Sequence, residues 1–162
     1  MRLLVLTLLP LGILIQTTVE AQQAPTIASR YQRVVADYRA LRHATAQPDL
    51  RNAAARSARD GYRVVIQSAN DESSLNADDL FALGQCHEAL RDVEQATTRY
   101  EQSMADGPTA RGKLALARLN AEIDPAIAES YSLEAQSIDP QDQTGRAFRV
   151  IYGEEDDLRE FA

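Results

Sequence analysis

The sequence predicts an all-α protein built from antiparallel helix pairs. Along most of the 162-residue chain, apolar residues recur at steps of three and four, the spacing that lines one face of a helix. Short segments rich in Asp, Gly and Pro separate these runs. No run alternates apolar and polar residues as a half-buried strand does. We therefore expect about three helix pairs, followed by a short C-terminal helix that caps them.

The first 21 residues have the pattern of a signal peptide. Arg2 supplies the positive n-region, Leu3 to Ile15 form an apolar h-region, and Val19-Glu20-Ala21 resembles a cleavage site. The alternative is a membrane anchor, but about 13 apolar residues fall short of the ~20 that span a bilayer as a helix. We expect an exported protein, periplasmic or extracellular, without membrane insertion after cleavage. Residues 22–153 would form the helical domain and residues 154–162 an acidic tail.

The first expected pair has long helices. One helix is predicted from Thr26 to about Ala46, and a second, rich in Ala and Arg, from Leu50 to about Ala69. The apolar side of the first carries Tyr31, Val34, Val35, Tyr38 and Leu41. Gln47-Pro48-Asp49 is expected to form the turn between them. Gly61 either weakens the second helix by about 1 kcal/mol relative to Ala or marks a close contact between helices.

The second expected pair, from Ala77 to Pro108, has the clearest pattern. The apolar face of its first helix carries Leu80, Leu83, His87 and Leu90. That of its second helix carries Val93, Ala96, Tyr100 and Met104. Asn76 and Asp92 are suitable N-caps, and Asp92 has capping-box spacing with Gln95. Gly84 and Ala96 are small enough to let the two helices approach closely.

The third pair and the cap follow Pro108. One helix is predicted from Thr109 to Ala121, and Asp124-Pro125 begins the next, with Asp as N-cap and Pro as first helical residue. A last amphipathic helix is expected after Gln141. Its apolar residues are Ala147, Phe148, Val150, Ile151 and Tyr152. We expect it to cover the open end of the stack.

The second pair resembles a tetratricopeptide repeat (TPR). The family pattern W-x2-L-G-x2-Y, followed by A-x3-F and a closing Pro, is matched in spacing. The matching residues are Leu80, Leu83, Gly84 and His87, then Ala96, Tyr100 and Pro108. Leu80 stands where the family prefers Trp, and His87 where it prefers Tyr. The flanking pairs match loosely. The resemblance implies an α-solenoid in which the first helices of successive repeats line a concave groove.

That resemblance implies a set of partner-binding residues on the three first helices. They are Gln32 and Arg39, then Asp78, Phe81, Gln85 and Glu88, and finally Arg111, Leu114 and Arg118. Phe81 stands beside Leu80 and is not needed for the core stripe. It is either an exposed aromatic anchor, the residue type enriched at interface cores, or it packs against the neighbouring pair.

The charge of −7 is unevenly distributed along the chain. Residues 22–70 hold eight Arg and three Asp, whereas residues 71–162 hold eight Arg or Lys and twenty Asp or Glu. Two ends of opposite charge favour head-to-tail association or a partner with two charged patches. The alternative is that these charges are only solvated helix faces. An acidic protein without a basic run interleaved with aromatics is not expected to bind nucleic acid.

Residues for catalysis or metal binding are sparse. The lone Cys86 is expected to be buried, with pairing to another chain or redox chemistry as alternatives. His43 and His87 lie on different pairs, and neither has a His, Cys, Asp or Glu one helical turn away. No nucleophile, metal or nucleotide motif occurs. We therefore expect no enzyme activity, no cofactor and no metal.

The function expected from these observations is that of an exported, non-enzymatic interaction module. Its partner would be a protein or peptide bound in the TPR-like groove. The alternative is a structural or accessory subunit of a cell-envelope assembly that associates through its oppositely charged ends. Self-association stays open in both cases.

Overall fold

The computed structural model describes residues 24–44, 47–70, 72 and 74–141. These residues form six helices and no strand, so the all-α prediction is confirmed. The helices are α1 (Ile27–Ala44), α2 (Pro48–Ala69), α3 (Ala77–Ala89), α4 (Val93–Ser103), α5 (Ala110–Asn120) and α6 (Pro125–Ile138). The predicted signal peptide, C-terminal capping helix and acidic tail fall on residues 1–21 and 142–162, outside the described residues.

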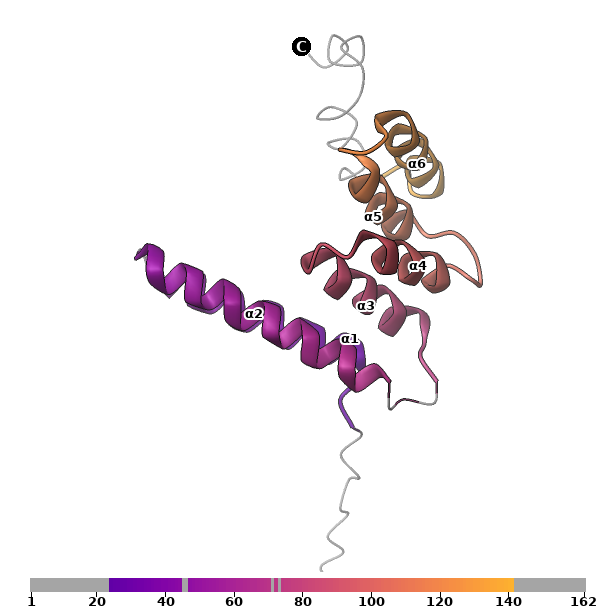
Figure 1. Ribbon diagram of the computed structural model, residues 1–162. Helices are drawn as coiled ribbons and strands as arrows, with labels where there is room; N and C mark the ends of the chain where they lie inside the picture. The colour runs from indigo at the N-terminus through magenta and orange to yellow at the C-terminus, as the bar shows by residue number, and fades with distance from the viewer. Residues whose placement is uncertain (1–23, 45–46, 71, 73, 142–162) are drawn as a thin grey trace, which may run out of the picture.

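The six helices stack in chain order as three pairs. The pairs are α1 with α2, α3 with α4, and α5 with α6; α3 also packs against α1 and α2, and α5 against α4 (Figure 1). This neighbour-to-neighbour packing is compatible with a helical repeat. With 18 and 22 residues, α1 and α2 are longer than α3, which has 13. The end of the first pair where α1 turns into α2 therefore projects beyond α3 (Figure 1).

Helix starts follow the predicted caps. The side chain of Asn76 accepts a hydrogen bond from the Asp79 N–H at 2.9 Å, and that of Asp92 accepts one from the Gln95 N–H at 3.3 Å. Asp124 accepts from the first turn of α6, with Pro125 as first helical residue. The predicted turn at residues 47–49 is wrong, because α2 already begins at Pro48. Proline suits the first helical position, where its missing N–H has no partner to lose.

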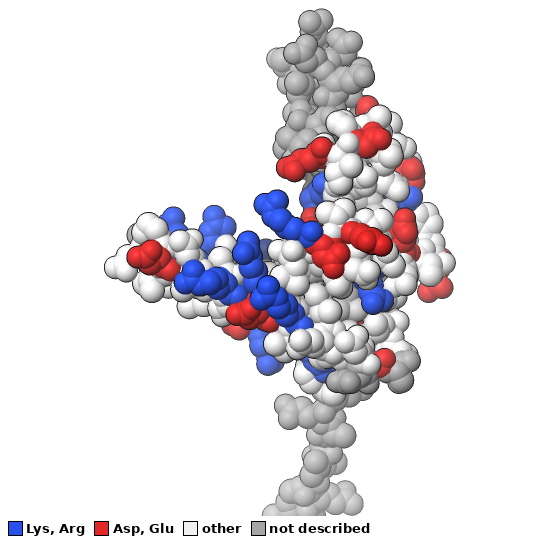
Figure 2. Space-filling model, in the orientation of Figure 1, with Lys and Arg blue, Asp and Glu red and all other residues white. Residues whose placement is uncertain are grey.

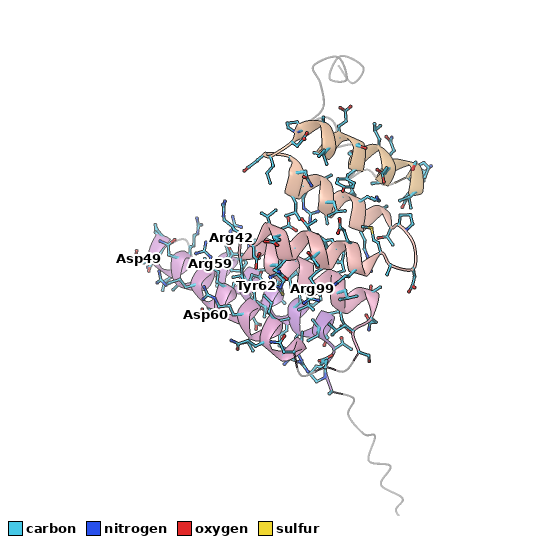
Figure 3. The ribbon with its side chains drawn as sticks, turned by 45° about the vertical axis from the view of Figure 1, so that its right-hand side comes forward. Arg42, Asp49, Arg59, Asp60, Tyr62 and Arg99 are labelled. Atoms are coloured by element: carbon cyan, nitrogen blue, oxygen red, sulfur yellow. The ribbon has the colours of Figure 1, made fainter. Side chains whose placement is uncertain are left out.

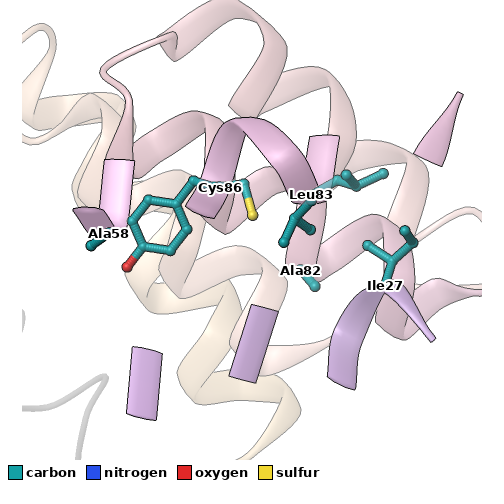
Figure 4. Close-up of a cluster of buried hydrophobic side chains, with 7 residues drawn as sticks. Ile27, Ala58, Ala82, Leu83 and Cys86 are labelled. Carbon is teal, nitrogen blue, oxygen red and sulfur yellow. The ribbon is translucent and has the colours of Figure 1, made fainter. Parts of the chain in front are cut away.

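The largest buried cluster joins the first pair to α3. It contains Ile27, Ala58, Tyr62, Val65, Ala82, Leu83 and Cys86 (Figure 4). The predicted stripe of α1 packs against it, except that Leu41 is 50% exposed. Leu41 is near the projecting end of the pair, which α3 is too short to cover. Val93, predicted to lie on the apolar face of α4, is also 40% exposed.

Glycines mark the close contacts within the pairs. A Cβ built at Gly84 would lie 2.6 Å from the ring of Tyr100, which is fully buried. A Cβ at Gly61 would lie 2.9 Å from the side chain of Val34. Both distances are shorter than carbon–carbon contacts allow. The predicted close approach at Gly84 is confirmed, and Gly61 marks a close contact between α1 and α2.

A buried carboxylate ties the start of α1 to α3. Asp79 is 3% exposed, and its Oδ1 accepts a hydrogen bond from the Ala28 N–H at 2.9 Å. Ala28 lies in the first turn of α1, where backbone N–H groups have no partner within the helix. Asp79 therefore joins two segments that are 51 residues apart in the sequence.

Replacing Asp79 by alanine should lower the free energy of unfolding by about 1–2 kcal/mol, because the Ala28 N–H loses its acceptor in a largely buried place. Asp79→Asn keeps an acceptor oxygen and should lose less. Urea unfolding of the two variants compares them directly. Equal losses would show that the charge of Asp79, and not its hydrogen bond to α1, is what matters.

Candidate partner-binding face

An aromatic ring and an ion pair adjoin on the first helices α3 and α5. Arg111 of α5 forms an ion pair with Asp78 of α3. Its guanidinium carbon also lies 4.7 Å from the ring centroid of Phe81, a cation–π arrangement. The Phe81 ring is half-buried and lies 5.1 Å, centroid to centroid, from the ring of Tyr100. Arg111 thus covers the outer side of an aromatic side chain whose inner side packs against the core.

A second ion pair joins the same two helices nearer the C-terminus of α3. Arg118 donates from Nε to Glu88 Oε1 at 3.2 Å and from Nη2 to Glu88 Oε2 at 3.1 Å. This two-point geometry fixes both side chains more firmly than a single contact would. The hydroxyl of the buried Tyr100 also donates to Glu88. Glu88 therefore connects α3, α4 and α5.

Burial raises the pKa of two tyrosines near this cluster, Tyr100 and Tyr31. Burial, aided by the negative charge of nearby Glu88, raises the pKa of Tyr100 well above its ordinary value. Burial is also the main cause that raises the pKa of Tyr31 to about 12, with smaller contributions from Tyr62, Cys86 and Glu88. Both hydroxyls stay protonated at neutral pH, so Tyr100 keeps the proton that it donates to Glu88.

The structure brings together five of the nine predicted site residues through ion pairs and a cation–π contact. The five are Asp78, Phe81, Glu88, Arg111 and Arg118, with half-buried Gln85 on the same helix as the first three. Gln32 and Arg39 are exposed on α1. Leu114 is only 5% exposed, so it belongs to the packing of α5 and not to an accessible surface.

Sequence reasoning missed the role of the Tyr100 hydroxyl. Tyr100 stands at the aromatic position of the second-helix pattern, where the repeat family prefers Phe. Its spacing predicts only a core residue. A buried tyrosine hydroxyl requires a polar partner, whereas phenylalanine does not. The Tyr at this position therefore indicates that a polar side chain lies nearby. The partner, Glu88, lies 12 residues earlier in the chain.

The lone cysteine, Cys86, is buried, and the neighbouring His87 is half-buried. Cys86 is fully buried, which confirms that prediction, and burial raises the pKa of its thiol to about 12. Nδ1 of His87 lies 3.2 Å from Asp92 Oδ2. Within the described ranges, no three His, Cys, Asp or Glu residues gather in a way that would hold a metal ion. In the same part of the chain, no helix has the length and apolar character of a membrane span.

Comparison of the chain with protein-family models, with curated proteins and with solved structures finds no match.

Proposed function

We propose that this chain is an exported, non-enzymatic interaction module of the tetratricopeptide kind, which binds a protein or peptide across α3 and α5. The observation that carries the proposal is the half-buried Phe81 next to two interhelical ion pairs, Asp78–Arg111 and Glu88–Arg118. Aromatic and Arg side chains are the types enriched where proteins bind one another.

The exposure and the ion pairing of Arg111 and Arg118 support this proposal. The side chains of Arg111 and Arg118 are 53% and 44% exposed although both are ion-paired. A guanidinium has five N–H donors in a planar fork, so each side chain keeps donors for an acceptor on a partner. The carboxylates hold the two guanidinium groups in place before binding, which lowers the entropy cost of recognition.

Arg111→Ala should weaken partner binding by about tenfold, a loss within the range for an interface arginine. The fold should be little affected, because an exposed ion pair contributes about 0–1 kcal/mol. The measurement is affinity capture from the exported fraction, with the amount of each captured protein compared between variants. Phe81→Ala is a poorer probe, since the ring packs against Tyr100 and its removal would also destabilise the fold.

Arg63→Ala is the matched control. Arg63 pairs with Asp60 on α2, and the two side chains are 60% and 71% exposed, close to the 53% and 68% of Arg111 and Asp78. Binding that falls equally in both variants would reflect loss of general positive charge. Binding that is unchanged in Arg111→Ala would contradict the proposed face.

A second candidate function is that of a structural subunit of a cell-envelope assembly, associating through oppositely charged ends. The supporting observation is the separation of charge in Figure 2. Blue side chains gather over the projecting first pair, and red ones over the stack of α3 to α6.

A further inference from the structure

Both ends of the described stack expose apolar side chains. Helical repeats bury each apolar face against the next repeat, and an end that stays in water usually has a polar outer face. Helix α6, at the C-terminal end, instead exposes Ile127 at 44%, Leu133 at 45% and Ile138 at 41%. At the N-terminal end, Leu41 and Leu50 are 50% and 51% exposed.

The apolar surface at the N-terminal end is a groove between two helices. Near the free end of the first pair, α1 and α2 form a hollow of about 420 Å³. Its lining is Leu41, Ala44, Leu50, Ala53, Ala54 and Ser57. An open groove with leucines on both helices and small residues along its floor suits an amphipathic helix.

The two ends carry opposite charges. Residues 39–59, around the free end of the first pair, include five Arg and one Asp. Residues 121–139, which contain α6, include five acidic residues and no basic one. Arg42 and Arg59, labelled in Figure 3, lie on the projecting part of the first pair, and neither forms an ion pair with a described residue.

We propose that the groove at the free end of α1 and α2 binds α6 of a second copy of this chain. The contact would place exposed Ile127 and Ile138 against Leu41 and Leu50, with acidic α6 beside the basic first pair. Contacts between like ends are disfavoured, since they would bring Arg against Arg or carboxylate against carboxylate. A contact between two different surfaces is heterologous, so each copy keeps one free end and chains of copies can grow.

This contact does not use the α3–α5 face. The proposal rests on the second candidate function, association through oppositely charged ends, and names a second copy of the chain as the partner. A chain that stays monomeric would overturn the self-contact alone, because the same ends remain able to bind another protein.

The test is sedimentation velocity of the purified chain and three serine variants over a range of concentrations. Leu50→Ser alters the groove and Ile127→Ser alters α6. Val93→Ser is the matched control, because Val93 is 40% exposed but lies on α4, away from both ends. We expect the average mass of the natural chain to rise with concentration and to fall at high salt. Each end variant should associate about tenfold more weakly, and Val93→Ser should match the natural chain.

Mixing the two end variants identifies the geometry. The Leu50→Ser chain keeps an intact α6 and the Ile127→Ser chain keeps an intact groove, so the mixture should form a one-to-one dimer of natural affinity and little beyond it. An Ile127→Ser chain that associates like the natural one would overturn the proposal. A purified chain that stays monomeric at every concentration would overturn it as well.

Discussion

Gly84→Ala should lower the free energy of unfolding by about 2 kcal/mol, even though alanine is the better helix former by about 1 kcal/mol. The new methyl carbon would lie 2.6 Å from two ring carbons of Tyr100. The ring has little room to move, since it is fully buried, packs against Phe81 and donates its hydroxyl proton to Glu88. The pair α3 and α4 must therefore separate.

Gly112→Ala is the control for this effect. The nearest atom to a Cβ at Gly112 is the sulfur of Met104, and this contact is at least as close as the one at Gly84. Methionine is unbranched and flexible, and its end can move aside at low cost. Thermal unfolding should show a loss of about 10 °C for Gly84→Ala and a much smaller change for Gly112→Ala. Equal losses would contradict the view that the rigidity of Tyr100 is what matters.

Alkaline pH should destabilise the protein through Cys86. Burial raises the pKa of its thiol from 9.0 to about 12, so the folded state holds a proton that the unfolded state releases. The stabilisation is complete below pH 9 and is lost as the pH rises from 9 towards 12. Each pH unit in that window costs about 1.4 kcal/mol, or about 4 kcal/mol by pH 12.

Cys86→Ala isolates this contribution. The variant has no thiol to titrate, so its free energy of unfolding should change less between pH 9 and pH 10 than that of the natural chain. Burial raises the pKa of Tyr31 from 10.0 to about 12, so Tyr31 contributes mainly above pH 10, outside this comparison. Urea unfolding at pH 8, 9 and 10 under reducing conditions measures the difference. Parallel curves would mean that the thiol is in contact with water in the folded protein.

Local signals predicted much of the fold. The caps at Asn76, Asp92 and Asp124 depend on residues within three positions, and each begins a helix where expected. Gly84 and Cys86 were also interpreted correctly, because small residues on an apolar face have few other uses. The error at Pro48 has a local cause, since the same proline is favoured both in a turn and at a helix start.

The sequence patterns could not predict contacts between distant segments. The spacing of Leu41 places it on the apolar side of α1, but its exposure depends on where α3 ends. The bond from Ala28 to Asp79 and the pairing of Glu88 with Arg118 join segments 51 and 30 residues apart. Of the site, the pattern identified the charged and aromatic residues of α3 and α5, but it did not show that they pair with one another.

The most direct test of the proposed interaction face is site-specific crosslinking in living cells. A photoreactive side chain would replace Gln85, which is half-buried on α3 between Phe81 and Glu88, or, as control, the exposed Glu101 on α4. We predict that position 85 crosslinks to one protein or peptide, that position 101 does not, and that Arg111→Ala reduces the crosslink. Crosslinks of equal yield at both positions, or none at position 85, would contradict binding across α3 and α5.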